Sequence, residues 1–192
     1  IPYDLEGGQD ILNHPDSEKL FLIMRAVQGV RNNQEGVDLF TLLNYSFMGC
    51  DYLETLKLSR LAAERKINLW EAMADNLKFE KVYKLLGALQ LDEAEGPFTV
   101  FFEKLINKTG FLDWCLKSEE AIEKLNVLNS LFSEIKRLNV ADPKLNLEKF
   151  LEIIDLMKNQ KIAVNEWDID ARSNAVLLTT AHRAKGREFE TV

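Results

Sequence analysis

Apolar residues recur along most of the chain at intervals of three and four positions, the spacing that lines one face of an α-helix. The clearest run keeps this spacing through Ile122, Leu125, Leu128, Leu131, Phe132, Ile135 and Leu138. The pattern predicts helices over 37–47, 80–91, 98–108, 111–117, 119–138 and 147–159. A chain with this pattern is expected to be mainly α-helical, with its helices packed as a multi-helix bundle.

Further helices are expected from residues that cap helix starts. His14 and Pro15 stand before a wide apolar stripe over 20–30. Asp51 and Asn68 are each followed three positions later by a glutamate. In this arrangement side chains satisfy amides that have no partner in the first helical turn. Helices should therefore begin close to each of these positions.

The pattern changes at both ends of the chain. Residues 175–180 form a short apolar run that suits a buried strand, and the first residues favour a strand that ends in a turn at Gly7 and Gly8. The polar and irregular stretch between the last helix and this apolar run predicts a linker. We therefore expect four parts, a strand over 1–10, a helical body over 11–160, a linker over 161–174, and a strand with its following loop over 175–192.

Composition restricts the classes of function that remain. The chain has 192 residues, of which 46% are hydrophobic and 29% are charged, a balance typical of a folded domain. Its 31 acidic and 24 basic residues give a formal charge of -7, which excludes a broad basic surface that holds DNA by charge alone. Cys50 and Cys115 lie far apart without a histidine cluster, so the sequence predicts neither a disulfide framework nor a metal site.

The ends and the apolar runs bear on where the protein works. No apolar run approaches the roughly 20 residues that a membrane span requires. The first residues have neither the basic start nor the apolar stretch of a signal peptide. We therefore expect a cytoplasmic protein. Because the chain opens on Ile1 rather than on methionine, we also expect it to be an internal piece of a longer protein.

The polar residues with the most specific pattern follow the second predicted strand. Thr180 and His182 can make neutral hydrogen bonds, and Lys185 offers a cation for phosphate. Gly186 lets the backbone approach a ligand closely, and Glu188 can accept a hydrogen bond from a sugar hydroxyl. In open α/β sheets, ligands bind beyond the carboxyl ends of the strands. The combination predicts a site for a nucleotide or a nucleic-acid backbone.

This segment resembles motif V of the superfamily one DNA helicases of the UvrD/Rep/PcrA group. The residues that stand where the motif has them are Thr180, His182, Ala184, Lys185, Gly186, Glu188, Phe189 and Val192. The Ile-Pro-Tyr start, followed by Gly7 and Gly8, resembles the segment that precedes the large helical insertion of that family. The helical stretch between the two ends resembles this insertion, the 2B subdomain, in its pattern alone. The resemblance thus covers the whole chain.

The resemblance implies a division of the chain between two parts of a helicase motor. Residues 1–10 and 175–192 would belong to the RecA-like α/β lobe 2A, and residues 11–160 would form the inserted 2B-like bundle. Thr180 and His182, with Lys185 as a weaker candidate, would contact the backbone of single-stranded DNA.

The same resemblance places the nucleotide at this motif. Glu188 would hydrogen-bond the ribose of ATP, with Gly186 beside it. The intact protein would be an ATP-dependent DNA helicase or translocase, of the kind that serves DNA repair, with ATP and Mg²⁺ as cofactors. Its partners would be single-stranded DNA and a duplex junction, together with proteins that dock on the helical insertion.

Two positions depart from the family pattern. Arg187 stands where the family usually has an apolar leucine. Relatives often carry a Gly-Ile-Gly turn that presents amides to duplex phosphates, whereas this chain has Met48, Gly49 and Cys50. The second departure puts duplex binding by the insertion in doubt.

The sequence also lacks two parts of the motor. It contains no GxxxxGK[ST] loop to cradle phosphates and no arginine-bearing segment after motif V. We therefore expect no catalytic residue, no bound cofactor and no ATP hydrolysis from this piece alone. Two alternatives remain: a helical protein-interaction module without motor activity, and the helicase arm of a helicase-nuclease.

The aromatic residues could serve as stacking platforms for bases or as core. Because they lie within apolar helical stretches, core is the favoured interpretation for Trp70, Phe101, Phe102, Phe111 and Trp114.

Overall fold

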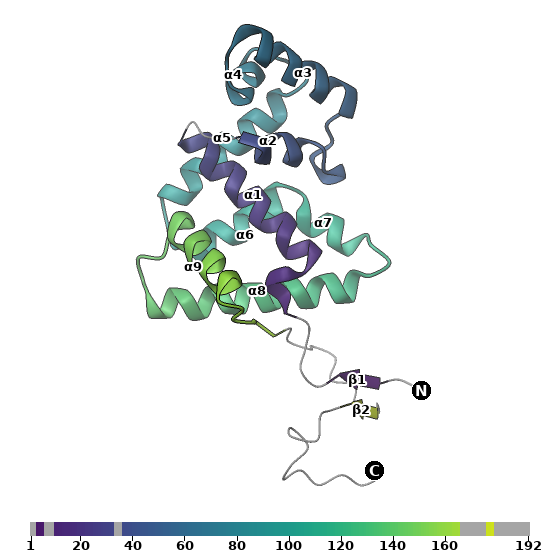
Figure 1. Ribbon diagram of the computed structural model, residues 1–192, viewed down its shortest axis with the longest axis vertical. Helices are drawn as coiled ribbons and strands as arrows, with labels where there is room; N and C mark the ends of the chain where they lie inside the picture. Colours follow the sequence, from purple (N-terminus) through teal and green to yellow (C-terminus); the bar gives the residue numbers. More distant parts are fainter. Residues whose placement is uncertain (1–2, 6–9, 33–35, 166–175, 179–192) are drawn as a thin grey trace.

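The computed structural model describes residues 3–5, 10–32, 36–165 and 176–178. Within these ranges the chain is mainly α-helical, as predicted from the apolar spacing (Figure 1). The helices are α1 (Pro15–Arg31), α2 (Gly36–Leu43), α3 (Tyr52–Arg65), α4 (Leu69–Ala74), α5 (Glu80–Ala94), α6 (Phe98–Lys108), α7 (Phe111–Leu116), α8 (Ala121–Ala141) and α9 (Leu147–Asn159). Two 3₁₀ turns, η1 (Ile11–Asn13) and η2 (Ser46–Met48), and two strands, β1 (Tyr3–Leu5) and β2 (Val176–Leu178), complete the described elements.

The capping residues act where the sequence predicts. His14 begins α1, and its Nδ1 accepts from the Asp16 amide at 3.2 Å. Asp51 begins α3 by accepting from the Glu54 amide at 3.0 Å. Asn68 begins α4 with a complete capping box. Each of these helix starts is therefore confirmed, and each depends on a side chain that satisfies a first-turn amide.

The second helix ends earlier than the predicted range 37–47. It ends at Leu43, where the Asn44 side chain donates to the Phe40 carbonyl at 2.8 Å. Tyr45 is then extended, and the chain turns through η2. An asparagine that bonds the backbone locally competes with the helical ladder, which explains the early end. The prediction of one continuous helix here was wrong.

Helix α1 lies at the centre of the helical body and packs against α2, α5, α8 and α9. The Phe150 ring is fully buried, with its centroid 4.9 Å from that of Phe98 and 6.4 Å from that of Phe21. Of the aromatic residues predicted as core, Phe101, Phe102 and Phe111 are buried in the core of the helical body. Trp70 and Trp114 are partly buried and pack against this core. One member of the predicted α8 stripe, Ile122, is instead 64% exposed.

The segment that enters the helical body at Asp10 and the segment that leaves it at Val164 lie side by side. The Asp10 carboxylate accepts from the Val164 amide at 3.0 Å and from the Leu12 amide at 3.2 Å. The Ile11 amide donates to the Val164 carbonyl at 2.9 Å. Beyond this junction, β1 and β2 pair in parallel, with Tyr3 opposite Val176 (Figure 1). The whole helical body is thus the crossover between two neighbouring parallel strands.

Candidate nucleotide and nucleic-acid interface

Strand β2 leads directly into the predicted site. It ends at Leu178, two positions before Thr180, and its partner β1 runs in the same direction. The carboxyl ends of both strands therefore lie at one edge of the sheet, the edge where open α/β sheets bind ligands. The predicted site residues themselves lie outside the described residues: Thr180, His182, Lys185, Gly186 and Glu188.

At the turn before α3, the Asp51 side chain already occupies the start of the helix. Gly49 has φ +69, a left-handed conformation that a glycine adopts without strain. Asp51 then places a carboxylate on the free amide of Glu54, the position that an anion would take at an open helix start. Hydrogen bonds from Lys57 and Lys78 lower the pKa of the Glu54 carboxyl to about 2, so it too is charged. Because Lys57 and Lys78 neutralise the Glu54 carboxylate, it is the Asp51 side chain alone that occupies the amide a duplex phosphate would need.

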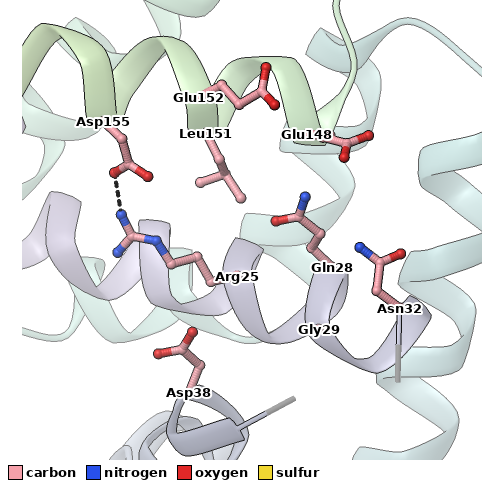
Figure 2. Close-up of a pocket in the computed structure, with 9 residues that line it drawn as sticks. All are labelled: Arg25, Gln28, Gly29, Asn32, Asp38, Glu148, Leu151, Glu152 and Asp155. Atoms are coloured by element: carbon pink, nitrogen blue, oxygen red, sulfur yellow. Dashed lines mark hydrogen bonds and ion pairs between the residues drawn. The ribbon is translucent and has the colours of Figure 1, made fainter. Parts of the chain in front are cut away.

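A polar groove of about 360 Å³ lies between α1, α9 and the start of α2 (Figure 2). Its charged side chains are Arg25, Asp38, Glu148, Glu152 and Asp155. Arg25 extends toward α9, where its Nη2 lies 2.6 Å from the Asp155 carboxylate (Figure 2). Because the one arginine is paired and three other acids remain, the groove repels phosphate rather than binding it.

A network of charges covers the Trp114 ring where α1, α7 and α8 meet. Asp16, only 4% exposed, lies 2.5 Å from the Lys19 ammonium and 3.7 Å from that of Lys124. Lys124 also lies 2.7 Å from Glu120, and this hydrogen bond raises its pKa. Both ammonium groups stand over the Trp114 ring, 4.7 Å and 5.2 Å from its centroid. The network fixes the packing of three helices, and its cations are already paired.

Burial sets the chemistry of the two cysteines. Cys115 is fully buried, and desolvation raises the pKa of its thiol to about 11. Burial also raises the pKa of the partly exposed Cys50 thiol.

Among the residues that the structure describes, no group of three or more His, Cys, Asp or Glu could hold a metal ion. No helix in the same ranges is long and apolar enough to cross a membrane.

The two thiols should therefore differ in reactivity. Because the thiolate is the nucleophile, we expect Cys50 to react with a thiol reagent in the native protein and Cys115 to react only on unfolding. Burial raises the pKa of the Cys115 thiol from its ordinary value of 9.0 to about 11, so the native state favours the protonated thiol. The contribution of Cys115 to the free energy of unfolding is therefore lost as the pH rises from 9.0 to about 11. Absorbance of released thionitrobenzoate measures both phases, and Cys50→Ser should remove the native phase alone. Two native phases of equal rate would contradict the assignment.

Comparison with known proteins identifies the family. The family model described as the UvrD-like helicase C-terminal domain matches residues 31–192. The chain belongs to this family. This UvrD-like chain also aligns over its full length with DNA helicase II of Haemophilus influenzae at 23% identity and with ATP-dependent DNA helicase PcrA of Staphylococcus epidermidis at 22% identity. PcrA of Staphylococcus aureus matches at 22% identity.

The chain spans 27% of the length of these relatives. The family match confirms the resemblance to the UvrD/PcrA helicases, and the structure confirms the mainly α fold. Two parallel strands need a connection that crosses from the end of one strand to the start of the other. In the UvrD-like chain described here, the helical body makes this connection.

Proposed function

We propose that this chain supplies an ATP-dependent DNA helicase or translocase with two parts: a regulatory helical insertion and the motif that couples ATP to single-stranded DNA. The observation that carries the proposal is the family match, which continues through the motif to residue 192. The parallel pairing of β1 with β2 supports it, because a pair of parallel strands is typical of a larger covered sheet. Residues 1–10 and 175–192 belong, in this proposal, to the RecA-like lobe 2A that contains this sheet.

In the intact protein, Thr180 and His182, with Lys185, contact the DNA backbone through hydrogen bonds and one cation. Glu188 hydrogen-bonds the ribose of ATP, and Gly186 allows the backbone to lie close to the nucleotide. Residues outside this chain supply the phosphate-binding loop and the Mg²⁺ ligands. Only eight positions separate Thr180 from Glu188, so one short segment would meet both ligands, which supports a role in coupling them.

The helical insertion, 11–160, is proposed to act through proteins more than through duplex phosphates. The Asp51 side chain occupies the Glu54 amide at the turn where relatives present amides, and the polar groove beside Arg25 is acidic overall. These observations favour the protein-interaction module as a second role for the insertion. They leave the motor role of the terminal motif unchanged.

The test substitutes Glu188 and His182 in the intact helicase. A hydrogen bond to a charged group contributes about 1.5 kcal/mol, so Glu188→Ala is expected to raise KM for ATP by about tenfold. His182→Ala is expected to reduce the stimulation of ATP hydrolysis by single-stranded DNA. Steady-state ATPase assays with and without oligonucleotide measure both effects. Arg187→Ala, a neighbouring cation without an assigned contact, serves as the control. Wild-type kinetics in both test variants would refute the proposal.

A further inference from the structure

His14 lies where the chain enters the helical body. Its amide donates to the Ile11 carbonyl at 3.2 Å and closes η1, and its carbonyl accepts from the Glu18 amide at 3.0 Å in the first turn of α1. The imidazole side chain is only 10% exposed. Asp10, four positions earlier, bonds the Val164 amide of the outgoing segment. A change at His14 therefore acts on the joint between the helical body and the strand pair.

The geometry of the α1 cap fixes where the neutral His14 ring carries its hydrogen. The Asp16 amide lies 3.2 Å from Nδ1, and a backbone amide can only donate, so Nδ1 is the acceptor. The hydrogen of the neutral ring is then on Nε2. A protonated ring carries a hydrogen on both nitrogens and has no lone pair left to accept with. The helix cap and a positive charge on His14 therefore exclude each other.

Two carboxylates lie beside the ring and favour the charged form. Glu123 Oε1 is 3.7 Å from Nε2, and Asp16 Oδ2 is 3.8 Å from Nδ1. The Asp16 carboxylate already pairs with Lys19 and Lys124. Within the described part of the chain, the half-exposed Glu123 carboxylate pairs with His14 alone. The 3.7 Å separation is too long for a hydrogen bond, so the charged ring has to move to close it.

The other charges near this joint are already held. The elements that pack against η1 are α1, α8 and α9. On α8, a hydrogen bond from Lys124 lowers the pKa of Glu120, and the charge on the imidazole contributes to the same shift. On α9, Lys158 pairs with Glu18 of α1. The Asp10 carboxylate accepts from backbone amides. Glu123 is thus the carboxylate left to receive Nε2 of a charged ring.

We propose that His14 is a pH-sensitive cap at the entry to the helical body. The neutral ring holds the first turn of α1 through the Asp16 amide. The charged ring releases this amide and pairs with Glu123 on α8. An ordinary imidazole takes up its proton between about pH 5 and 8, which no other ordinary side chain does. Acidification therefore frees the start of α1 beside the joint, and this role is independent of the proposed motor function.

Heteronuclear NMR of the 192-residue chain tests the two states of the ring. At about pH 8, Nδ1 is expected to be unprotonated and the Asp16 amide protected from hydrogen exchange. At about pH 5, both ring nitrogens should carry hydrogen, and the protection factor of the Asp16 amide should fall about fivefold, the usual contribution of a helix cap.

Glu123→Gln removes the partner of the charged ring. It is expected to lower the midpoint of the imidazole titration by about 0.2–0.7 pH units, the range for an exposed ion pair. Glu119→Gln, which changes an exposed carboxylate close by in the sequence, should leave the midpoint unchanged. An unchanged midpoint in Glu123→Gln would exclude Glu123 as the partner and contradict the proposal.

His14→Asn separates capping from titration, because asparagine is a favoured cap and takes up no proton in this range. Its Asp16 amide should be equally protected at both pH values. His182→Asn, which removes the other histidine of the chain, is the matched control and should keep the pH dependence of the wild type. A neutral ring with its hydrogen on Nδ1 would overturn the proposal. So would wild-type protection that does not change with pH, or an equal loss of protection in His14→Asn.

Discussion

Replacing Phe150 with alanine is expected to lower the free energy of unfolding by about 3–5 kcal/mol, the largest effect of any substitution considered. The ring is fully buried and lies against both Phe21 and Phe98, so its removal leaves a cavity that these neighbours cannot fill. Urea unfolding followed by circular dichroism measures the change. Leu156→Ala, on the same helix but with an exposed side chain, should change stability by about 0.5 kcal/mol or less. Similar losses in both variants would show that α9 does not anchor the core through Phe150.

The second largest effect is expected from Asp16→Ala. Its carboxylate faces Lys19 and Lys124, and Lys124 is only 9% exposed. Removing the carboxylate takes one of two partners from the nearly buried Lys124, and the expected loss is about 3 kcal/mol, the low end for breaking a buried pair. The remaining pair with Glu120 keeps the loss from being larger.

The control for this prediction is the exposed pair between Glu80 and Lys84 on α5. Lys84→Ala is expected to leave stability unchanged, because exposed pairs contribute little. The same denaturation experiment compares the two variants. If Asp16→Ala is as stable as the wild type, the charge network over Trp114 does not hold α1, α7 and α8 together.

The helical part of the fold follows from local signals in the sequence. The ranges 98–108 and 147–159 match α6 and α9, because each has a regular apolar stripe between a start signal and a turn. Asp51 and Asn68 mark helix starts because their side chains bond amides three positions away. Such contacts lie within one turn, so a single sequence contains all the information needed to place them.

Features that depend on distant residues could not be predicted in this way. Ile122 keeps helical spacing with the core positions of α8 but is exposed, because no other described helix covers the first turn of α8 on that side. Lysine side chains are mostly exposed in proteins, yet α1 and α7 bury Lys124. The motif from Thr180 to Glu188 was found through its resemblance to a helicase family, and the roles of its residues stay predictions.

The junction at Asp10 and Val164 also bears on the order of folding. Direct pairing of β1 with β2 in an unfolded chain would close a loop of more than 170 residues, which carries a large entropic cost. Once the helices have packed, the Asp10 carboxylate and the Val164 amide bring the two ends together, and only short segments remain to be ordered. The helical body should therefore fold before the two strands pair.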